Sequence, residues 1–433
     1  MFFGKRRASQ VFTPGELPLE RSNVYVSRRA SEELLTRGVE RNWCPVVYGD
    51  YGVGKSTLVR RYFRHEESAN WFERTFRGKP RRGRLVYFAS TNGLTMPKVF
   101  ATILEHLQYR VETEVTTSSS VDSGLSFERS KLTANLTAKR GREAVRKLVV
   151  SAPTDEAMLR IINENRLTII IDELHQSTKS FRDELVPFIK ASRISAKKST
   201  LVLIGTSAEP FSLVSSDPGI DRFVIDTPVA SMGPDEARSL ITDGFSKLGL
   251  EIDDSIVNVT VSSASGAPSI LQALCLDMAE ATMDDGRRRV SQADLISAVK
   301  HYVEDRHGRM TRKYMAAIET TGPKRYRKRI LHAIAGLEGD YATMDDIRAA
   351  VVKELGTEVR SSDLSGPLRA LKTAEYGSVL QDVDRETGGR IQNLNSFTDP
   401  MMKSYVRFMA TITTTEIIHE DELRESLAAD SSL

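Results

Sequence analysis

Residues 49–56 form the segment Gly-Asp-Tyr-Gly-Val-Gly-Lys-Ser, which is rich in glycine and ends in a lysine and a hydroxyl residue. The apolar run 45–48 before it is typical of a short buried strand, and residues 57–63 after it have helical spacing. In this context the glycines let backbone N–H groups surround a phosphate, and the helix N-terminus adds its positive dipole end. The segment therefore predicts a phosphate-binding loop inside a parallel α/β fold.

Two side chains of this loop have specific predicted roles. Lys55 can reach the β- and γ-phosphates of a nucleotide, and the Ser56 hydroxyl can bind Mg²⁺. We therefore predict a nucleotide and Mg²⁺ as cofactors. The loop residues predicted to bind the nucleotide are Gly49, Asp50, Tyr51, Gly52, Val53, Gly54, Lys55, Ser56 and Thr57.

The length and composition are those of a globular protein with several domains. A chain of 433 residues can hold two or three domains with their own cores. No run resembles a membrane span, and Cys44 and Cys275 have no metal-ligand spacing, so we expect reduced thiols and a cytoplasmic location. A net charge of +3 is too small to indicate nucleic acid by itself, so the distribution of charge must decide that question.

The first half of the chain alternates between strand and helix patterns. Five short runs are continuously apolar and rich in β-branched residues, as expected for a parallel sheet covered on both faces. We therefore predict an α/β class fold. The predicted strands are 45–48, 85–89, 167–171, 201–204 and 223–225.

The pattern becomes helical from residue 234, and the last part predicts helix, helix, helix, hairpin, helix. The Gly388-Gly389 pair is a turn signal between the alternating runs 378–383 and 390–395. That order is typical of a winged helix. The predicted divisions are an N-terminal extension (1–23), an ATPase α/β domain (24–233) with a mobile insertion (113–138), a helical lid (234–305), a basic connector (306–326), a winged-helix domain (327–412) and an acidic tail (413–433).

The apolar run 167–171 ends in Asp172-Glu173 and predicts the second half of the nucleotide site. A carboxylate at this strand end lies beside the phosphate loop, where Asp172 can hold Mg²⁺ through water. Glu173 can orient or deprotonate the attacking water. The alternative is a strand that merely ends in an acidic turn.

Two further residues are candidates for phosphate contacts. Thr206 follows the strand at 201–204, and ligands gather at the carboxyl ends of parallel strands, so its hydroxyl could sense the γ-phosphate. Arg222 precedes the last strand and could project into a neighbouring subunit to stabilise the transferring phosphoryl group. An ordinary turn and a surface arginine are the alternatives. His175 is expected to be a polar residue beside the site or in a turn, and a catalyst is the alternative.

The Asp172-Glu173 pair, the strand tipped by Thr206 and the Arg222-Phe223 pair resemble the AAA+ and STAND groups of P-loop ATPases. The likeness is greatest to the replication-initiator clade, the origin-recognition ATPases and their archaeal relatives. It covers about residues 24–409. It implies ATP as the nucleotide, ATP hydrolysis, Thr206 as the first sensor and Arg222 as an arginine finger in a homo-oligomer.

The lid departs from the initiator pattern. Residues 265–268 are Ser-Gly-Ala-Pro, and Pro268 stands where initiators have an arginine sensor. A Gly-x-Pro at this point is similar to STAND ATPases, in which the proline packs against the nucleotide. Pro268 is therefore a predicted nucleotide contact, and the resemblance implies a slow switch rather than fast turnover.

The C-terminal domain and the residues before it contain the candidate DNA contacts. In a winged helix the third helix usually enters the major groove and the wing meets phosphate. The alternative is a winged helix used for protein contact. The residues predicted to bind double-stranded DNA are Arg325, Arg327, Lys328, Arg329, Ser362, Arg369, Lys372 and Arg390.

Two functions fit these patterns. The first is an ATP-dependent AAA+/STAND switch that binds DNA in replication initiation, transposition control or mobile-element defence. The second is a signalling ATPase whose winged helix binds a protein partner and no nucleic acid.

Overall fold

The computed structural model describes most of the chain in eight stretches. The predicted insertion at 113–138 and the Gly388-Gly389 turn lie outside the described residues, as does most of the predicted acidic tail. The described stretches are 6–15, 24–67, 84–107, 154–206, 218–306, 308–319, 325–387 and 390–415.

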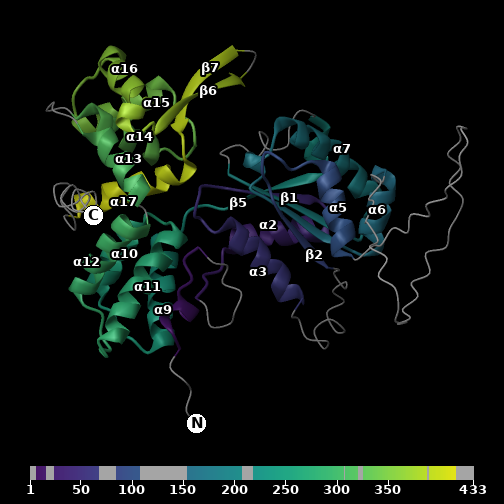
Figure 1. Cartoon of the computed structure of the whole chain (residues 1–433), viewed down its shortest axis with the longest axis horizontal. Helices are drawn as coiled ribbons and strands as arrows, with labels where there is room; N and C mark the ends of the chain where they lie inside the picture. The colour runs from purple at the N-terminus through teal and green to yellow at the C-terminus, as the bar shows by residue number, and fades with distance from the viewer. Residues whose placement is uncertain are drawn as a thin grey trace, which may run out of the picture.

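One sheet of five parallel strands organises the α/β domain, in the order β2-β3-β4-β1-β5 (Figure 1). All five predicted strands are present, with ends that shift by up to three residues. Since the strands are parallel, their carboxyl ends lie at one edge, where β1 leads into the phosphate loop. The strands are β1 (Cys44–Tyr48), β2 (Leu85–Ala89), β3 (Thr168–Asp172), β4 (Thr200–Gly205) and β5 (Val224–Pro228).

Each face of the sheet has its own apolar core, because successive side chains of a strand point to opposite faces. Ile169 and Ile171 of β3 pack on one face with α5, α6 and α7, and Ile170 packs on the other with α2 and α3. The continuous apolar runs of the sequence therefore supply side chains to the cores on both faces of the sheet. The helices are α2 (Arg29–Glu40), α3 (Lys55–Glu67), α5 (Met96–His106), α6 (Asp155–Glu164) and α7 (Lys179–Ser195).

Four helices form the lid beside the sheet: α9 (Pro234–Leu248), α10 (Asp254–Ala264), α11 (Pro268–Asp284) and α12 (Gln292–His301). The predicted N-terminal extension contributes to this lid. Its short helix α1 (Ala8–Val11) is buried against α9 and α11, and the Phe12 ring lies 5.2 Å from that of Phe245.

The stretch predicted as a basic connector is largely helical. It contains the end of a π-helical turn, η3 (Tyr302–Arg306), and helix α13 (Gly308–Ile318). Met310, Tyr314 and Ile318 of α13 are buried in the core, so helix α13 is packed into the fold.

The C-terminal part has the predicted order of three helices, an antiparallel hairpin and a final helix. The third helix, α16 (Ser361–Ala370), is followed by a short 3₁₀ turn, η4 (Ala374–Tyr376). The remaining elements are α14 (Tyr326–Gly336), α15 (Met344–Leu355), β6 (Leu380–Thr387), β7 (Arg390–Phe397) and α17 (Pro400–Thr414).

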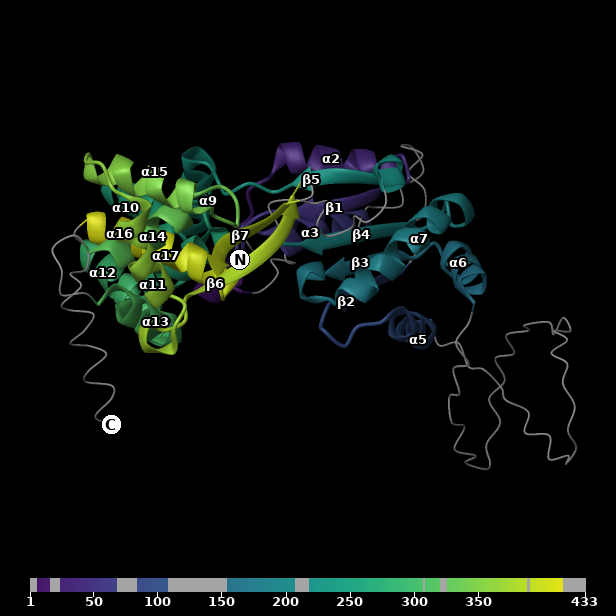
Figure 2. The ribbon, with the colours of Figure 1, turned by 90° about the horizontal axis from the view of Figure 1, so that it is seen from above.

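The last helix, α17, packs on both the lid and the C-terminal domain. It contacts α10 of the lid and α14 of its own domain, and its apolar residues belong to one core that runs through both (Figures 1 and 2). The Phe408 ring lies 5.0 Å from that of Tyr302, and the Tyr405 hydroxyl lies 2.7 Å from the Thr311 hydroxyl. Helix α17 therefore ties the two helical parts together beside the phosphate loop.

Candidate nucleotide-binding site

The phosphate loop connects β1 to α3 in a conformation that favours glycine at Gly49, Gly52 and Gly54, which all have positive φ angles. At Gly49 the φ angle is +152°, and a Cβ atom would lie 2.2 Å from the carbonyl oxygen of Val229. At Gly52 φ is +75°, and a Cβ atom would lie 2.6 Å from the Oγ of Ser269. Larger residues would be strained at both positions. The second contact brings the first turn of α11 directly onto the loop.

Lys55 is the first residue of α3 and is buried, with 9% of its surface exposed. Its Nζ donates hydrogen bonds to the carbonyl oxygens of Gly49 at 3.0 Å and Asp50 at 2.7 Å. Burial lowers the pKa of Lys55 to about 8. The ammonium group is thus held inside the curve of the loop by weak partners that phosphate oxygens can replace.

Asp172 is the last residue of β3 and is 4% exposed. The Ser56 hydroxyl donates to its Oδ2 at 2.5 Å, and the Tyr87 hydroxyl donates to the same oxygen. The backbone N–H of Glu173 donates to Oδ1 at 2.7 Å. Serine and carboxylate oxygens are ligands that Mg²⁺ takes beside phosphates, so the predicted pair fits Mg²⁺.

Glu173 follows directly in a left-handed conformation, with φ +55°, which starts the 3₁₀ turn η1 (Leu174–Gln176). The side-chain amide of Gln176 donates to its carboxylate. Burial, and then the neighbouring Asp172 carboxylate, raise the pKa of Glu173 above its usual value. A carboxylate with a raised pKa is a better proton acceptor, as the predicted general base requires.

His175 joins the phosphate loop to the end of β4. The backbone N–H of Thr206 donates to His175 Nδ1 at 3.2 Å, and His175 Nε2 lies 2.6 Å from the Tyr51 hydroxyl. Since Nδ1 accepts a hydrogen bond, the neutral ring carries its proton on Nε2. This N–H group then donates a hydrogen bond to the oxygen of the Tyr51 hydroxyl. Burial, followed by the charge of Lys55, lowers the pKa of His175 to about 4. The sequence predicted a polar residue beside the site or in a turn, but no local pattern indicated which two elements His175 connects.

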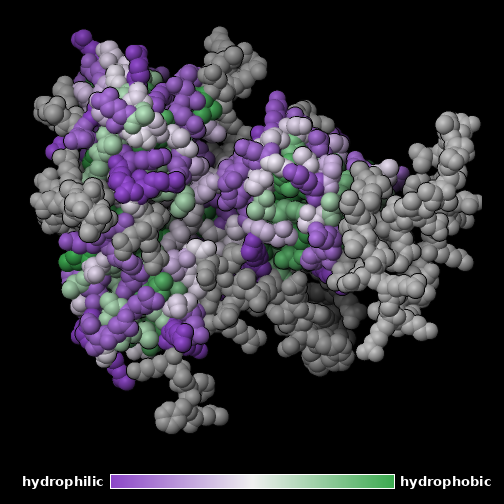
Figure 3. Space-filling view, in the orientation of Figure 1, coloured by the Kyte–Doolittle hydropathy of each residue, from purple (hydrophilic) through white to green (hydrophobic). Residues whose placement is uncertain are grey.

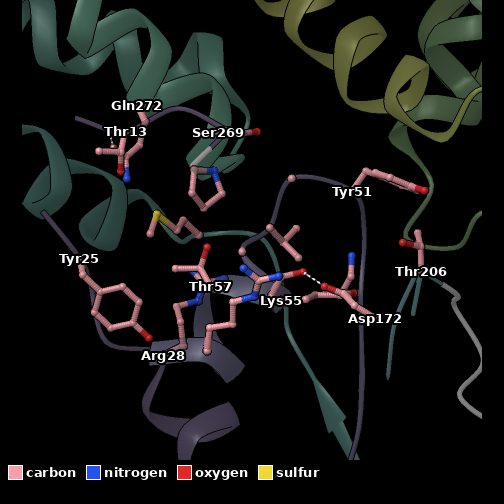
Figure 4. A pocket seen from close by; sticks show the side chains of 18 of the residues that line it. Thr13, Tyr25, Arg28, Tyr51, Lys55, Thr57, Asp172, Thr206, Ser269 and Gln272 are labelled. Carbon is pink, nitrogen blue, oxygen red and sulfur yellow. Dashed lines mark hydrogen bonds between the residues drawn. The ribbon is translucent and has the colours of Figure 1, made fainter. Parts of the chain in front are cut away.

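A cavity of about 480 Å³ extends from this centre toward the lid. Figure 4 shows Asp172, Tyr51 and Thr206 at one end and Thr13 and Gln272 at the other. Gly52, Val53, Gly54, Lys55, Ser56, Thr57, Glu173, Thr206 and Pro268 all line it, as do Val24, Tyr25, Val26, Arg28, Arg60, Met232 and Leu240. The structure therefore brings most of the predicted nucleotide and metal residues to one cavity.

The far end of the cavity contains a buried polar atom without a hydrogen bond. The backbone N–H of Thr13 donates to Gln272 Oε1 at 2.7 Å, but the Thr13 hydroxyl has no partner, although the residue is only 9% exposed. An unsatisfied buried hydroxyl costs about 1–3 kcal/mol unless a ligand satisfies it. Apolar walls with one such group fit a nucleobase. The sequence did not indicate either residue, because both lie far from the loop along the chain.

Gly49, Asp50 and Arg222 were predicted for the site but do not line the cavity. Arg222 is exposed at the end of the 3₁₀ turn η2 (Pro218–Arg222) and does not line the cavity. The adjacent Phe223 carbonyl accepts from Cys44 at the start of β1, so Arg222 lies at the opposite sheet edge from the loop. Arg222 therefore cannot reach the phosphate loop of its own subunit. Asp50 belongs to the loop, but its carboxylate faces Lys403 and Arg407 of α17.

The predicted DNA contacts are dispersed over the C-terminal domain. Ser362 and Arg369 on α16 are exposed, as is Arg325 before α14. Others have partners within the domain. Arg327 donates to the Ala317 carbonyl and stacks 4.0 Å from the Tyr376 ring, Arg329 pairs with Glu354, and Lys372 lies 2.5 Å from Asp382. Lys328 is partly buried on α14, and Arg390 begins β7.

The fold and the site are those of a P-loop ATPase domain. Residues 39–210 match a protein-family model described as "AAA domain". This match includes the phosphate loop, Asp172 and Glu173. A comparison with curated protein sequences gives no match. Among the described residues, none of the helices has the length and apolar character needed to span a bilayer.

Several solved structures are similar along most of the chain. The Aeropyrum pernix Orc1 protein in complex with DNA is 16% identical, covering 95% of this chain and 98% of that one, with a TM-score of 0.47. Cdc6p from Pyrobaculum aerophilum is 14% identical, covering 94% of this chain and 98% of that one, with a TM-score of 0.43. The Thermotoga maritima RuvB Holliday junction branch migration motor is 15% identical, covering 88% of this chain and 95% of that one, with a TM-score of 0.39. At these identities and TM-scores the likeness assigns no residue and no partner to this chain.

Proposed function

We propose that this protein is an ATP-dependent switch that binds duplex DNA, in replication initiation, transposition control or mobile-element defence. The observation that carries the ATPase site is the approach of the Ser56 hydroxyl to the Asp172 carboxylate, 2.5 Å apart at the mouth of the phosphate loop. These are the oxygens that would hold Mg²⁺, which, when bound, neutralises charge on the phosphates.

The side chains of the site have complementary roles in hydrolysis. Lys55 exchanges its two loop carbonyls for phosphate oxygens and remains inside the loop. Glu173 orients the attacking water and accepts its proton, while the Gln176 amide holds the carboxylate in place. His175 fixes Thr206 and Tyr51 relative to each other, which places the first-sensor residue beside the loop.

Slow turnover is supported by the lid. Of the described lid residues, Leu240, Pro268, Ser269 and Gln272 line the cavity, and none is cationic. Charge that develops on the transferring phosphoryl group therefore receives no lid arginine within one subunit. Arg222 of a neighbouring subunit would supply it, so we infer that the ATP-bound form is a homo-oligomer.

The C-terminal domain is the proposed DNA-binding part. Its described surface carries hydrophilic side chains over α15 and α16 (Figure 3). Arg369 on α16 and Arg325 before α14 are exposed and can approach phosphates. Phosphate contacts supply most of the affinity in nonspecific DNA binding.

One observation favours the signalling function. Arg327, Arg329 and Lys372 are engaged within the domain, which leaves fewer cations for phosphate than the sequence indicated. A partner protein is then the ligand of this surface.

A gel shift with duplex DNA, with and without ATP and at two salt concentrations, tests the proposal. We expect retardation that needs low salt, because phosphate contacts release counterions. The Arg325→Gln/Arg369→Gln variant should weaken it, whereas the matched Lys98→Gln/Arg288→Gln variant, with two exposed cations changed elsewhere, should not. Sizing in the same buffers reports the oligomer. No retardation of duplex at low salt favours the signalling function.

A further inference from the structure

Three side chains of α17 reach from the C-terminal domain to the phosphate loop. Lys403 Nζ lies 3.2 Å from Asp50 Oδ1, and Arg407 Nη1 lies 3.1 Å from Asp50 Oδ2. Ser404 donates its hydroxyl to the carbonyl oxygen of Tyr51 at 3.3 Å. One turn of a helix near residue 405 thus contacts two consecutive residues of the loop at 50 and 51.

Both cations also have partners within their own domain, in addition to Asp50. Lys403 Nζ also donates to the Gly339 carbonyl at 3.1 Å and lies 3.5 Å from Asp340, and Arg407 donates to the Leu337 carbonyl at 2.7 Å. These partners lie just after α14. The segment after α14 therefore holds the ends of Lys403 and Arg407 in fixed positions.

The four charges at this contact balance and are largely shielded from water. Lys403 is 6% exposed and Asp50 is 20% exposed, and two cations face the two carboxylates of Asp50 and Asp340. A buried charge that loses its partner is strongly unfavourable. If α17 moved away, the carboxylate of Asp50 would remain without a counter-charge on the loop that has to receive an anionic triphosphate.

The same loop residue also contacts the phosphate-binding lysine. The Asp50 backbone carbonyl accepts from Lys55 at 2.7 Å, while its carboxylate is bound by α17. Docking of α17 therefore neutralises negative charge and holds the backbone at the position where Lys55 must present its ammonium group. Both effects favour anion binding.

We propose that Lys403 and Arg407 are positioning residues of the phosphate loop, so that ATP binding and docking of the C-terminal domain strengthen each other. The proposal rests on the proposed function, because it assumes that the loop binds ATP. A coupling of this kind is reciprocal: the factor by which docking raises ATP affinity is the factor by which ATP favours docking.

A charge-removal series on the full chain tests the first half of this coupling, with ATP affinity measured by competition against a fluorescent ATP analogue. We expect Lys403→Met/Arg407→Leu to weaken ATP binding about tenfold, since roughly that factor follows from leaving the carboxylate of Asp50, on the loop itself, without a counter-charge. Adding Asp50→Asn should restore most of the affinity, because the repelling charge is gone. A variant weakened only by poor folding of α17 would not be rescued. The control Lys353→Met/Arg288→Leu changes two exposed cations and should match the parent.

Amide hydrogen exchange of residues 400–414 tests the reciprocal half. ATP should slow exchange there in the parent protein and have little effect in Asp50→Asn. Exchange that ATP leaves unchanged or accelerates in the parent overturns the proposal, as does equal ATP affinity in the parent and Lys403→Met/Arg407→Leu. A parent that binds no ATP overturns the proposed function and this inference with it.

Discussion

The hydroxyl of Ser56 and the carboxylate of Asp172 lie 2.5 Å apart, although 116 positions separate them in the sequence. Ser56 follows β1 and Asp172 ends β3, and β4 lies between these strands in the sheet. Since all three strands are parallel, their carboxyl ends meet at one edge, where ligands of open α/β sheets bind. The sheet order therefore creates the proposed Mg²⁺ site from two unconnected segments.

Removing the proposed general base should separate ATP binding from hydrolysis. In Glu173→Gln we expect ATP affinity within about twofold of the parent and a turnover at least about 10²-fold lower, the usual contribution of a positioned base. Lys55→Ala should abolish binding. Equilibrium ATP binding and phosphate release measure the two effects. Hydrolysis by Glu173→Gln at the parent rate would refute the assignment of the base.

The histidine bridge should matter for turnover more than for affinity. His175→Phe keeps a ring of similar shape but loses the hydrogen bonds to Thr206 and Tyr51. We expect about a tenfold lower turnover, because small displacements of catalytic groups are costly, with ATP affinity changed less than about threefold. His106→Phe, at an exposed position on α5, is the control. Equal losses in both quantities would mean that the bridge only supports folding of the loop.

The unpaired hydroxyl of Thr13 should contribute to affinity for the base. Thr13→Val removes it at nearly constant volume, and we expect ATP affinity to fall about three- to tenfold, the value of one hydrogen bond. Thr13→Ser should retain the parent affinity. Binding of a ribose triphosphate without a base should be the same in all three proteins. If Thr13→Val binds ATP as tightly as the parent, the hydroxyl does not contact the nucleotide.

The stability of the lid should depend on a partly buried ion pair in a pH-dependent manner. Arg287 binds Asp294 through two hydrogen bonds of 2.7 and 2.8 Å and lowers the pKa of Asp294 to about 2. Because the folded-state pKa is depressed, this stabilisation is complete above about pH 4 and is lost as the pH falls toward 2.

Asp294→Asn should therefore lower the free energy of unfolding by about 2 kcal/mol at pH 7. The difference from the parent should shrink below pH 4, as measured by urea unfolding. Asp285→Asn removes the other, exposed partner of Arg287 and should cost well under about 1 kcal/mol. A difference between parent and Asp294→Asn that is constant from pH 7 to pH 3 would show that the charge of Asp294 is not the cause.

The elements that the sequence predicted well are those with local patterns. The strands of the sheet are continuous apolar runs, and the phosphate loop is one contiguous segment, so both are visible without any knowledge of distant contacts. Asp172 and Glu173 were found because they end such a run. The order of helices and hairpin in the C-terminal part was also predicted from local patterns, with a glycine turn between the two strand runs.

The contacts that the N-terminal segment and α17 make with the site were not predictable. Thr13 lies in what the sequence indicated as an extension, yet it reaches the cavity because α1 packs into the lid. Asp50 was predicted as a nucleotide contact, but its carboxylate pairs with Lys403, 353 positions away.

The sequence by itself determined that this chain forms a sheet with a phosphate loop, since backbone conformation and strand patterns depend on near neighbours. Only the tertiary structure decided which groups surround that loop. The packing of the lid and of α17 is a balance of many weak contacts spread over the chain, and no local pattern records where a helix of one domain comes to rest on another.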